Sequence, residues 1–177
     1  SWHENWWGWA SPALVKTLPS DESYASGGGA DDQPPYQELD NFTFGAGNNA
    51  VKAAWTISYW TLFRTNMILE RVTEGENEIK AIRAMLFLDL VQQWGDVPLV
   101  NRVLTPDEYD FPRTPKAEVY AQIEQDLTEA IADLPTKADY SAADRFRMSK
   151  GAAYALLGKA QLYQDKFSEA AASFEQV

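Results

Sequence analysis

The sequence predicts an all-α fold, in which helices pack as a repeat bundle behind an irregular N-terminal loop segment. Three observations lead to this prediction. Apolar residues recur at helical spacing in five stretches after residue 48. No segment alternates with the two-residue period of a strand between hairpin turns. Proline and glycine interrupt the chain between the periodic stretches, where helices are expected to end.

Composition favours one domain and limits the function. The chain has 177 residues, of which 45% are hydrophobic, enough for a core. Its 26 acidic and 15 basic side chains give a net charge of −11, which disfavours nucleic acid and anionic membranes as partners. It has no cysteine, which excludes disulfides, thiolate catalysis and Cys-ligated metals. The sequence contains no run of about 18 apolar residues, so no membrane-spanning helix is predicted. Because the chain begins at Ser1 without Met and stops within a predicted helix, we expect a fragment truncated at the C-terminus.

Residues 1–48 form the irregular segment, rich in aromatic residues, glycine and aspartate. Four tryptophans fall between Trp2 and Trp9, and turn-forming residues dominate from residue 20 to residue 48. Disordered linkers are poor in aromatic residues, whereas this segment mixes aromatics with carboxylates. A long loop of this kind is either a ligand-binding loop or a loop packed against the helices, and the sequence leaves both interpretations open.

Residues 49–177 are predicted to fold as tetratricopeptide-like helices. The second helix is apolar on nearly every side, which is typical of the centre of a helical protein, and Gly95 and Pro98 mark its end. Thr114 is expected to cap the third helix, with Pro115 at its first position. The expected helices span about 49–72, 77–94, 115–134, 149–164 and 167–177.

The last two predicted helices follow the spacing of a tetratricopeptide repeat. Gly158 and Ala160 permit close helix approach, Ala170 fits the tight crossing, and Phe174 fills the space beside it. Gln161 stands where the repeat prefers an aromatic residue. One repeat cannot bury its own apolar face, so we expect neighbouring helices to cover it.

A Gly- and Asp-rich N-terminal loop is followed by a series of helical motifs in a fixed order: Trp55-x3-Tyr59 with Arg64-x-Asn66, Ile82-Arg83-Ala84, Asp89-Leu90-Val91, Trp94 to Val100, Val119-Tyr120-x2-Ile123-x2-Asp126-Leu127, and Ala152 to Leu157. Together these motifs show a resemblance to the SusD/RagB family of glycan-binding outer-membrane lipoproteins. It implies a SusD-like domain, here incomplete, that is not an enzyme. It further implies a lipid anchor upstream of this chain, a position on the extracellular face of the outer membrane, and a SusC-like TonB-dependent transporter as partner.

Sugar recognition requires an aromatic ring against the C–H face of the sugar and polar groups that reach its hydroxyls. The N-terminal loop offers such a set, and we predict ligand binding by Asp31, Asp32, Tyr36, Asn41 and Phe44. Tyr36 and Phe44 fit equally well as residues that anchor the loop to the core. Trp55, Tyr59 and Trp60 lie on a predicted helix and are interpreted as core residues.

No catalytic or metal-binding residues are predicted. His3 is the only histidine, so a zinc site or a Ser-His-Asp triad lacks its residues. No cofactor is expected, although the loop carboxylates leave a structural calcium ion as an alternative. The predicted function is therefore non-catalytic capture of oligo- or polysaccharides for import. A peptide-binding member of the same family, a tetratricopeptide interaction scaffold and a helical glycan-processing enzyme remain as rivals.

Overall fold

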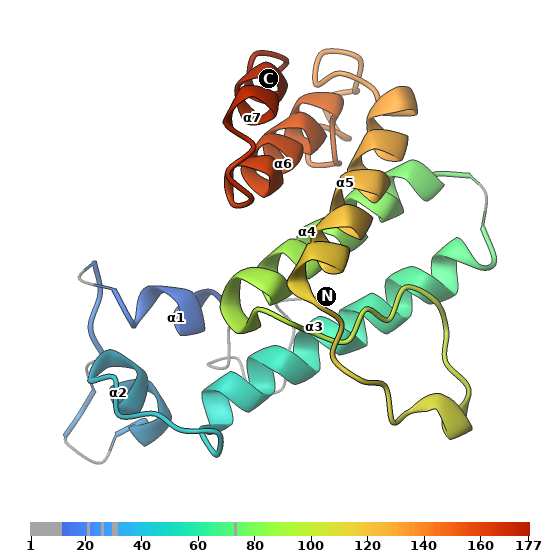
Figure 1. Cartoon of the computed structure of the whole chain (residues 1–177). Coiled ribbons are helices and arrows are strands. Elements are labelled where there is room, and N and C mark those ends of the chain that lie inside the picture. The colour runs from blue at the N-terminus through green and yellow to red at the C-terminus, as the bar shows by residue number, and fades with distance from the viewer. Residues whose placement is uncertain (1–11, 21, 26, 30–31, 73) are drawn as a thin grey trace. The chain divides into compact units, whose positions relative to one another are not determined.

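The chain is helical in the part that the computed structural model describes, residues 12–20, 22–25, 27–29, 32–72 and 74–177 (Figure 1). Across these ranges the only extended pairing is a single antiparallel bridge between Val97 and Thr114. The prediction of an all-α fold is confirmed. The helices are α1 (Pro12–Thr17), α2 (Pro34–Asp40), α3 (Asn49–Leu69), α4 (Glu76–Trp94), a 3-10 turn η1 (Pro106–Glu108), α5 (Lys116–Asp133), α6 (Lys150–Leu162) and α7 (Phe167–Phe174).

The chain divides into two compact units, Ser1–Thr61 and Leu62–Val177, and the division falls inside α3. We predicted the boundary between the irregular segment and the helical part at residue 48. In the structure, the segment before this boundary contains α1 and α2. The reason is a small apolar core in which Tyr36 and Leu39 of α2 are buried together with Leu18 and Ala50. The first turn of α3 thus packs with the N-terminal segment.

Asn48 joins α2 to the start of α3. Its side-chain oxygen accepts hydrogen bonds from the backbone amides of Ala50 (3.0 Å) and Val51 (3.1 Å), which caps the helix. Its amide nitrogen donates to the Pro35 carbonyl and to Glu38 Oε2, both at 2.8 Å. Because Asn48 is 3% exposed and both ends of its amide are used, it sets where α2 lies relative to the first turn of α3.

The second unit is built around α4. Phe87, Leu86 and Leu90 of this helix are at most 1% exposed, as its apolar surface predicts. Helix α5 packs along α4, α6 packs against α5, and α7 folds back on α6 (Figure 1). Gly95 ends α4 with φ 67° and ψ −117°, a conformation that suits glycine and agrees with its predicted role as a helix stop.

The start of α5 differs from the prediction. Pro115 precedes the first helical residue, and Thr114 does not cap the helix, because the Thr114 hydroxyl accepts from the Leu99 amide at 3.3 Å. Instead, Asp96 Oδ1 accepts from the Lys116 amide at 2.8 Å. The turn after α4 therefore supplies the cap of α5, which couples the end of one helix to the beginning of the next.

The α6–α7 hairpin has the close packing of a tetratricopeptide repeat. A Cβ atom built on Gly158 would lie 2.8 Å from the ring of Phe174, so only glycine fits beside this ring as it stands. Gln161, the departure from the repeat pattern, accepts a hydrogen bond from the buried Ser173 hydroxyl at 2.7 Å. Its polar side chain thus has a structural partner across the hairpin.

Candidate functional site

The first unit carries an open hollow of about 310 Å³ on its surface. It is lined by two aromatic residues, two carboxylates and two serines: Ser20, Glu22, Ser23, Tyr24, Asp40 and Phe42. Tyr24 is 76% exposed and Phe42 is 70% exposed. Two exposed rings beside two carboxylates give the hollow the apolar faces and polar acceptors that sugar binding requires.

One side of the hollow is formed by the turn that follows α1. The hydroxyls of Ser20 and Ser23 both donate to the Thr17 carbonyl, at 2.5 and 2.9 Å. This carbonyl belongs to the last turn of α1 and has no partner within the helix, so the serines satisfy it. The two bonds hold the chain in a tight turn that carries Glu22 and Tyr24 into the lining.

The other side is formed by the C-terminal end of α2. The Phe42 amide donates to the Leu39 carbonyl (3.2 Å), and the Thr43 amide donates to the Glu38 carbonyl (2.9 Å). These two bonds make a Schellman motif, in which the residue at the Phe42 position adopts a left-handed conformation and is usually glycine. Phe42 has φ 55°, a conformation that costs a residue with a side chain about 1–2 kcal/mol. A bulky, exposed aromatic residue therefore occupies a place where it brings strain.

Apart from the Tyr24 hydroxyl, the described side chains of the hollow offer a ligand hydrogen-bond acceptors and no unused donors. Asp40 Oδ2 accepts from the Ala25 amide at 3.1 Å, which ties the two sides of the hollow together. Among the described residues, none donates a hydrogen bond to Asp40 Oδ1 or to the Glu22 carboxylate. Since both serine hydroxyls already donate to Thr17, a ligand in this hollow is required mainly to donate hydrogen bonds.

The residues predicted for ligand binding lie in different environments in the structure. Tyr36 lies in the small core at 7% exposure, and this burial raises the pKa of its hydroxyl. Asp32 Oδ2 accepts from the Gly28 amide at 2.8 Å and so closes the glycine turn. Asn41 and Phe44 are exposed on either side of Phe42, and Phe44 is 42% exposed. Asp31 lies outside the described residues, as does His3.

The aromatic and acidic residues that line the hollow lie in the same N-terminal segment as the residues predicted for ligand binding, but were not predicted themselves. The signal that separates Phe42 from its neighbours is local: it stands one residue beyond the C-cap Asn41, where glycine is the usual residue. A sequence argument that located the end of α2 would have selected Phe42. The bond from the Ala25 amide to Asp40 joins the segment that carries Tyr24 to the end of α2, and no spacing rule predicts this bond.

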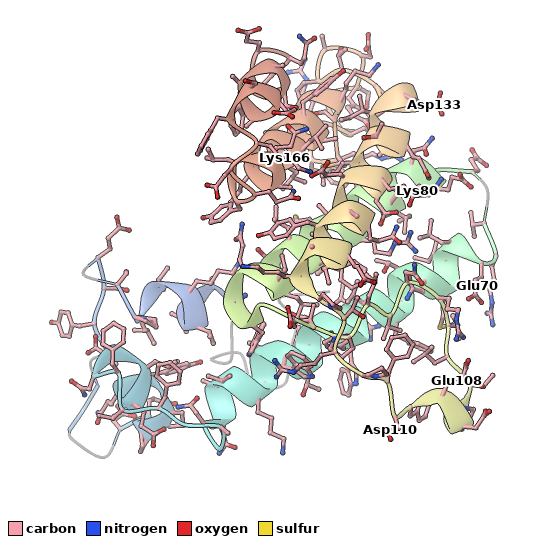
Figure 2. All side chains as sticks on the ribbon, in the orientation of Figure 1. Glu70, Lys80, Glu108, Asp110, Asp133 and Lys166 are labelled. Carbon is pink, nitrogen blue, oxygen red and sulfur yellow. The ribbon has the colours of Figure 1, made fainter. Side chains whose placement is uncertain are left out.

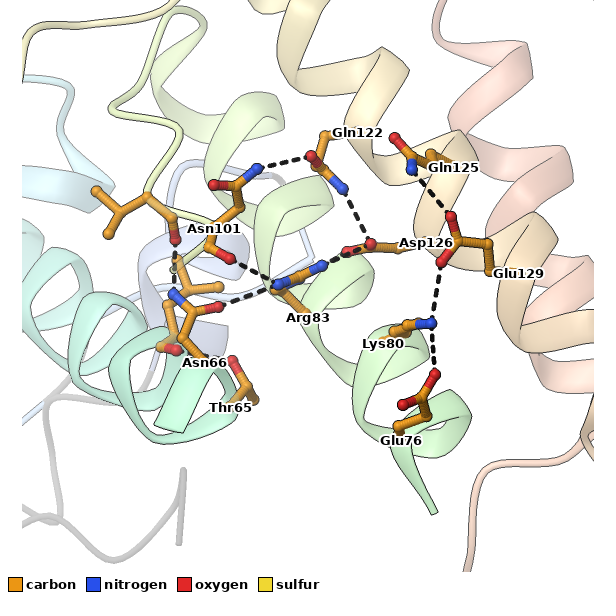
Figure 3. A network of polar contacts seen from close by, with 12 residues as sticks. Thr65, Asn66, Glu76, Lys80, Arg83, Asn101, Gln122, Gln125, Asp126 and Glu129 are labelled. Atoms are coloured by element: carbon orange, nitrogen blue, oxygen red, sulfur yellow. Dashed lines mark hydrogen bonds and ion pairs between the residues drawn. The ribbon is translucent and has the colours of Figure 1, made fainter. Parts of the chain in front are cut away.

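A buried polar network lies in the second unit (Figure 3). It joins Asn66, Arg83 and Asp126, which belong to three of the motifs on which the family resemblance rests. Arg83 donates to both carboxylate oxygens of Asp126, from Nε at 2.8 Å and from Nη2 at 2.7 Å. Its Nη1 donates to Asn66 Oδ1 (3.2 Å) and to the Asn101 carbonyl (2.8 Å). Asp126 also accepts from Gln122 at 2.9 Å. Arg83 is 8% exposed and Asp126 1%, so this is a buried, bidentate ion pair in which both Nη1 hydrogens of Arg83 also have acceptors.

This network positions the segment that follows α4. The Asn66 amide donates to the carbonyls of Val100 (2.9 Å) and Arg102 (3.1 Å), and the Asn101 side chain donates to Gln122 at 2.9 Å. The residues of α3, α4 and α5 thus hold three consecutive residues of irregular backbone. We interpret the network as structural, because Asn66, Arg83 and Asp126 are buried and their polar atoms bind one another and the neighbouring backbone.

The next stretch of the same segment is held by one exposed ion pair and by a bond from its backbone to Glu70; Figure 2 labels the two acidic residues, Glu70 and Glu108. Arg102 donates to both oxygens of Glu108, at 2.6 and 2.8 Å, and Glu70 accepts from the Val103 amide at 2.7 Å. The Arg102 guanidinium, with the amide and hydroxyl of Thr105, lowers the pKa of Glu108 to about 2. Glu108 and Thr105 form a capping box around η1.

Within the described ranges, no group of three or more His, Asp or Glu side chains is arranged to hold a metal ion. Likewise, no helix in the same ranges is long and apolar enough to cross a membrane. The arrangement in the hollow is suited to binding by stacking and hydrogen bonding.

Comparison with known proteins identifies similar chains. A family model of the SusD-like type, described as starch-binding and associating with the outer membrane, matches residues 35–162. The SusD-like protein P2 of Formosa agariphila is 31% identical over 147 residues, which cover 76% of this chain and 28% of that protein.

Two solved structures that resemble this chain are also SusD-like proteins. A laminarin-binding SusD-like protein is 35% identical, with a TM-score of 0.83, over 92% of this chain and 37% of the other. A SusD-like carbohydrate-binding protein from Bacteroides fragilis NCTC 9343 is 26% identical, with a TM-score of 0.74, over 80% of this chain and 29% of the other. The chain thus spans less than two fifths of the length of each of these three relatives.

Proposed function

Because the chain belongs to the SusD-like family, we propose that the protein captures oligo- or polysaccharides at the cell surface and delivers them for import without cleaving them. In this proposal it is anchored by a lipid to the extracellular face of the outer membrane. Its partner there is a SusC-like TonB-dependent transporter, which receives the glycan.

The observation that carries the proposal is the hollow of the first unit. A pyranose ring has a C–H face that packs on aromatic rings and an equator of hydroxyls that donate hydrogen bonds. Tyr24 and Phe42 offer the rings, and Asp40 Oδ1 and the Glu22 carboxylate offer acceptors that no described donor occupies. In the absence of a ligand the two rings face solvent, and apolar surface of this kind gains free energy when a ligand covers it.

The sequence-predicted residues take different places in this proposal. Asn41 and Phe44 stay proposed ligand contacts, because they are exposed next to Phe42 and can extend its surface along a longer glycan. Asp32 and Tyr36 are proposed to act through the loop, the first by closing the glycine turn and the second by anchoring α2. Asp31 remains a proposed contact on the strength of the sequence alone.

A protein partner is supported by apolar side chains on the α6–α7 hairpin. Tyr163 is 58% exposed and Phe167 is 62% exposed, beside a repeat that needs neighbours to cover its apolar face. We propose that this part of the protein contributes to assembly with the transporter. Mild-detergent purification of the full-length protein from its native membrane is expected to recover a TonB-dependent transporter with it, and recovery of the protein alone contradicts this part of the proposal.

Binding of the complete protein to soluble polysaccharides tests the proposed function. In native gels cast with laminarin or starch, the glycans named for one relative and for the family, we expect at least one glycan to slow migration. After incubation with the same glycans, no new reducing ends are expected. Failure to bind any glycan in a broad panel, or release of reducing ends, contradicts the proposal. Binding of peptides in place of glycans favours the peptide-binding alternative.

A further inference from the structure

We propose that the hollow lined by Tyr24, Phe42, Glu22 and Asp40 is a subsite selective for uncharged sugar rings, and that Phe42 is a ligand-stacking residue kept at the expense of stability. This inference rests on the proposed glycan-binding function and adds the class of sugar. It follows from the charge of the lining, from its hydrogen-bonding capacity and from the backbone of Phe42.

The described side chains of the lining carry negative charges and no positive ones. Among them, Glu22 and Asp40 are the only ionisable groups apart from the Tyr24 phenol, and neither carboxylate forms an ion pair within the described part of the chain. A sugar that carries a carboxylate or a sulfate would bring a like charge next to both. Like charges at short range repel, and no lysine or arginine lines the hollow to offset this. The repulsion selects against uronic acids and sulfated sugars.

The hydrogen-bonding pattern selects in the same direction. The hollow offers Asp40 Oδ1 and the Glu22 carboxylate as acceptors, while the serine hydroxyls use their protons on the Thr17 carbonyl, so that the Tyr24 hydroxyl is the side-chain donor that remains in the lining. A neutral sugar presents hydroxyls, each of which donates one proton to a carboxylate in a charge-assisted bond. A sugar carboxylate or sulfate has only acceptors at that position, and leaves the protein acceptors unsatisfied.

The conformation of Phe42 indicates that its ring is retained for binding. At φ 55° in a Schellman motif, glycine is the residue of lowest strain, and a 70% exposed ring contributes little to the core. Neither local backbone preference nor burial accounts for phenylalanine here. A wall against the C–H face of a sugar does account for it, since this role requires a rigid, exposed aromatic ring at the edge of the hollow.

Affinity for matched neutral and anionic glycans tests the selectivity. The probes are laminarin and laminarin oxidised at its primary hydroxyls to carboxylates, which share one backbone, titrated into the full-length protein by calorimetry. We expect at least tenfold weaker binding of the oxidised form at low salt, and a smaller ratio at high salt, where charges are screened. In the Glu22→Gln/Asp40→Asn variant we expect the ratio to fall towards one, whereas Glu175→Gln, which removes an exposed charge in the second unit, leaves it unchanged.

The possible outcomes distinguish a failure of this inference from a failure of the proposed function. Equal or tighter binding of the oxidised glycan overturns the selectivity and leaves glycan capture standing. Absence of binding to laminarin, starch and every other glycan of the panel overturns the proposed function itself. Phe42→Gly is expected to raise the unfolding midpoint and to weaken binding at least tenfold, while Phe146→Ala, at an 85% exposed ring in the second unit, keeps wild-type affinity. A Phe42→Gly variant with unchanged affinity overturns the role of Phe42.

Discussion

Removal of the Asp126 carboxylate is expected to destabilise the second unit more than any exposed charge does. Asp126 is 1% exposed and binds Nε and Nη2 of Arg83, which is itself 8% exposed. In Asp126→Ala the guanidinium keeps Asn66 and the Asn101 carbonyl but loses its only charged partner. Breaking a buried pair from one side costs about 3–5 kcal/mol, because the remaining charge stays in a poorly solvated site.

A double variant distinguishes the contribution of the ion pair from that of the other bonds that Arg83 makes. Replacing both members of a buried ion pair by apolar residues is often nearly neutral. In Arg83→Met/Asp126→Leu, however, the buried Asn66 Oδ1 also loses its donor, at about 1–3 kcal/mol, and the carbonyl of the exposed residue Asn101 loses its bond to Arg83. We therefore expect the double variant to be destabilised, but by less than the sum of the two single variants.

Urea unfolding followed by far-UV circular dichroism measures these differences. Lys80→Ala is the matched control, since Lys80 lies one turn from Arg83 on α4 and pairs with the half-exposed Glu76 and Glu129. Such a pair contributes up to about 1 kcal/mol. If Asp126→Ala loses no more free energy of unfolding than Lys80→Ala, the structural role assigned to the network is refuted.

Three further predictions concern the backbone, the repeat and an acidic side chain. Gly95→Ala is expected to lower the free energy of unfolding by about 1–3 kcal/mol in the same urea assay, because φ 67° with ψ −117° is nearly exclusive to glycine, and an unchanged value contradicts this. Gly158→Val is expected to cost about 1–3 kcal/mol by displacing the Phe174 ring, and the loss should shrink in a Phe174→Ala background; additive losses refute the contact. The Glu108 carboxyl should titrate at about pH 2 by NMR, so that its stabilising contribution is complete above the ordinary glutamate pKa and is lost as pH falls towards 2, and Arg102→Gln should raise this pKa.

Most of the helical part could be predicted because its signals are local. The apolar surface of α4, the glycine at its end and the spacing of Gly158 against Phe174 each depend on residues close in the chain. The family-diagnostic residues Arg83 and Asp126 were recognised as a pattern, and their contact supplies the physical reason for it: a buried arginine requires a carboxylate from the facing helix.

The remainder depended on contacts between distant residues. Asp96 caps α5 across the turn, in place of Thr114, because the bridge between Val97 and Thr114 brings the two segments together. No pattern in the sequence distinguishes this arrangement from a local cap. The same limitation applies to the N-terminal unit, where the Tyr36 side chain had two equally good interpretations and the small core selects burial.

The candidate site was predicted by segment and not by residue. Aromatic and acidic residues alternate throughout the N-terminal loop, so composition located the region but could not rank its members. The left-handed turn at Phe42 and the bond from the Ala25 amide to Asp40 determine which side chains line the hollow. Both features belong to the folded chain.

NMR of the full-length protein with a neutral laminarin oligosaccharide tests whether the hollow binds a sugar ring against Tyr24 and Phe42. Stacking on an aromatic face shifts the C–H protons of the sugar upfield and brings them close to ring protons. We predict such shifts, with cross-relaxation between the sugar and the ring protons of Phe42, and their loss in Phe42→Gly. An oligosaccharide that binds while the Tyr24 and Phe42 resonances stay unchanged would contradict binding in this hollow.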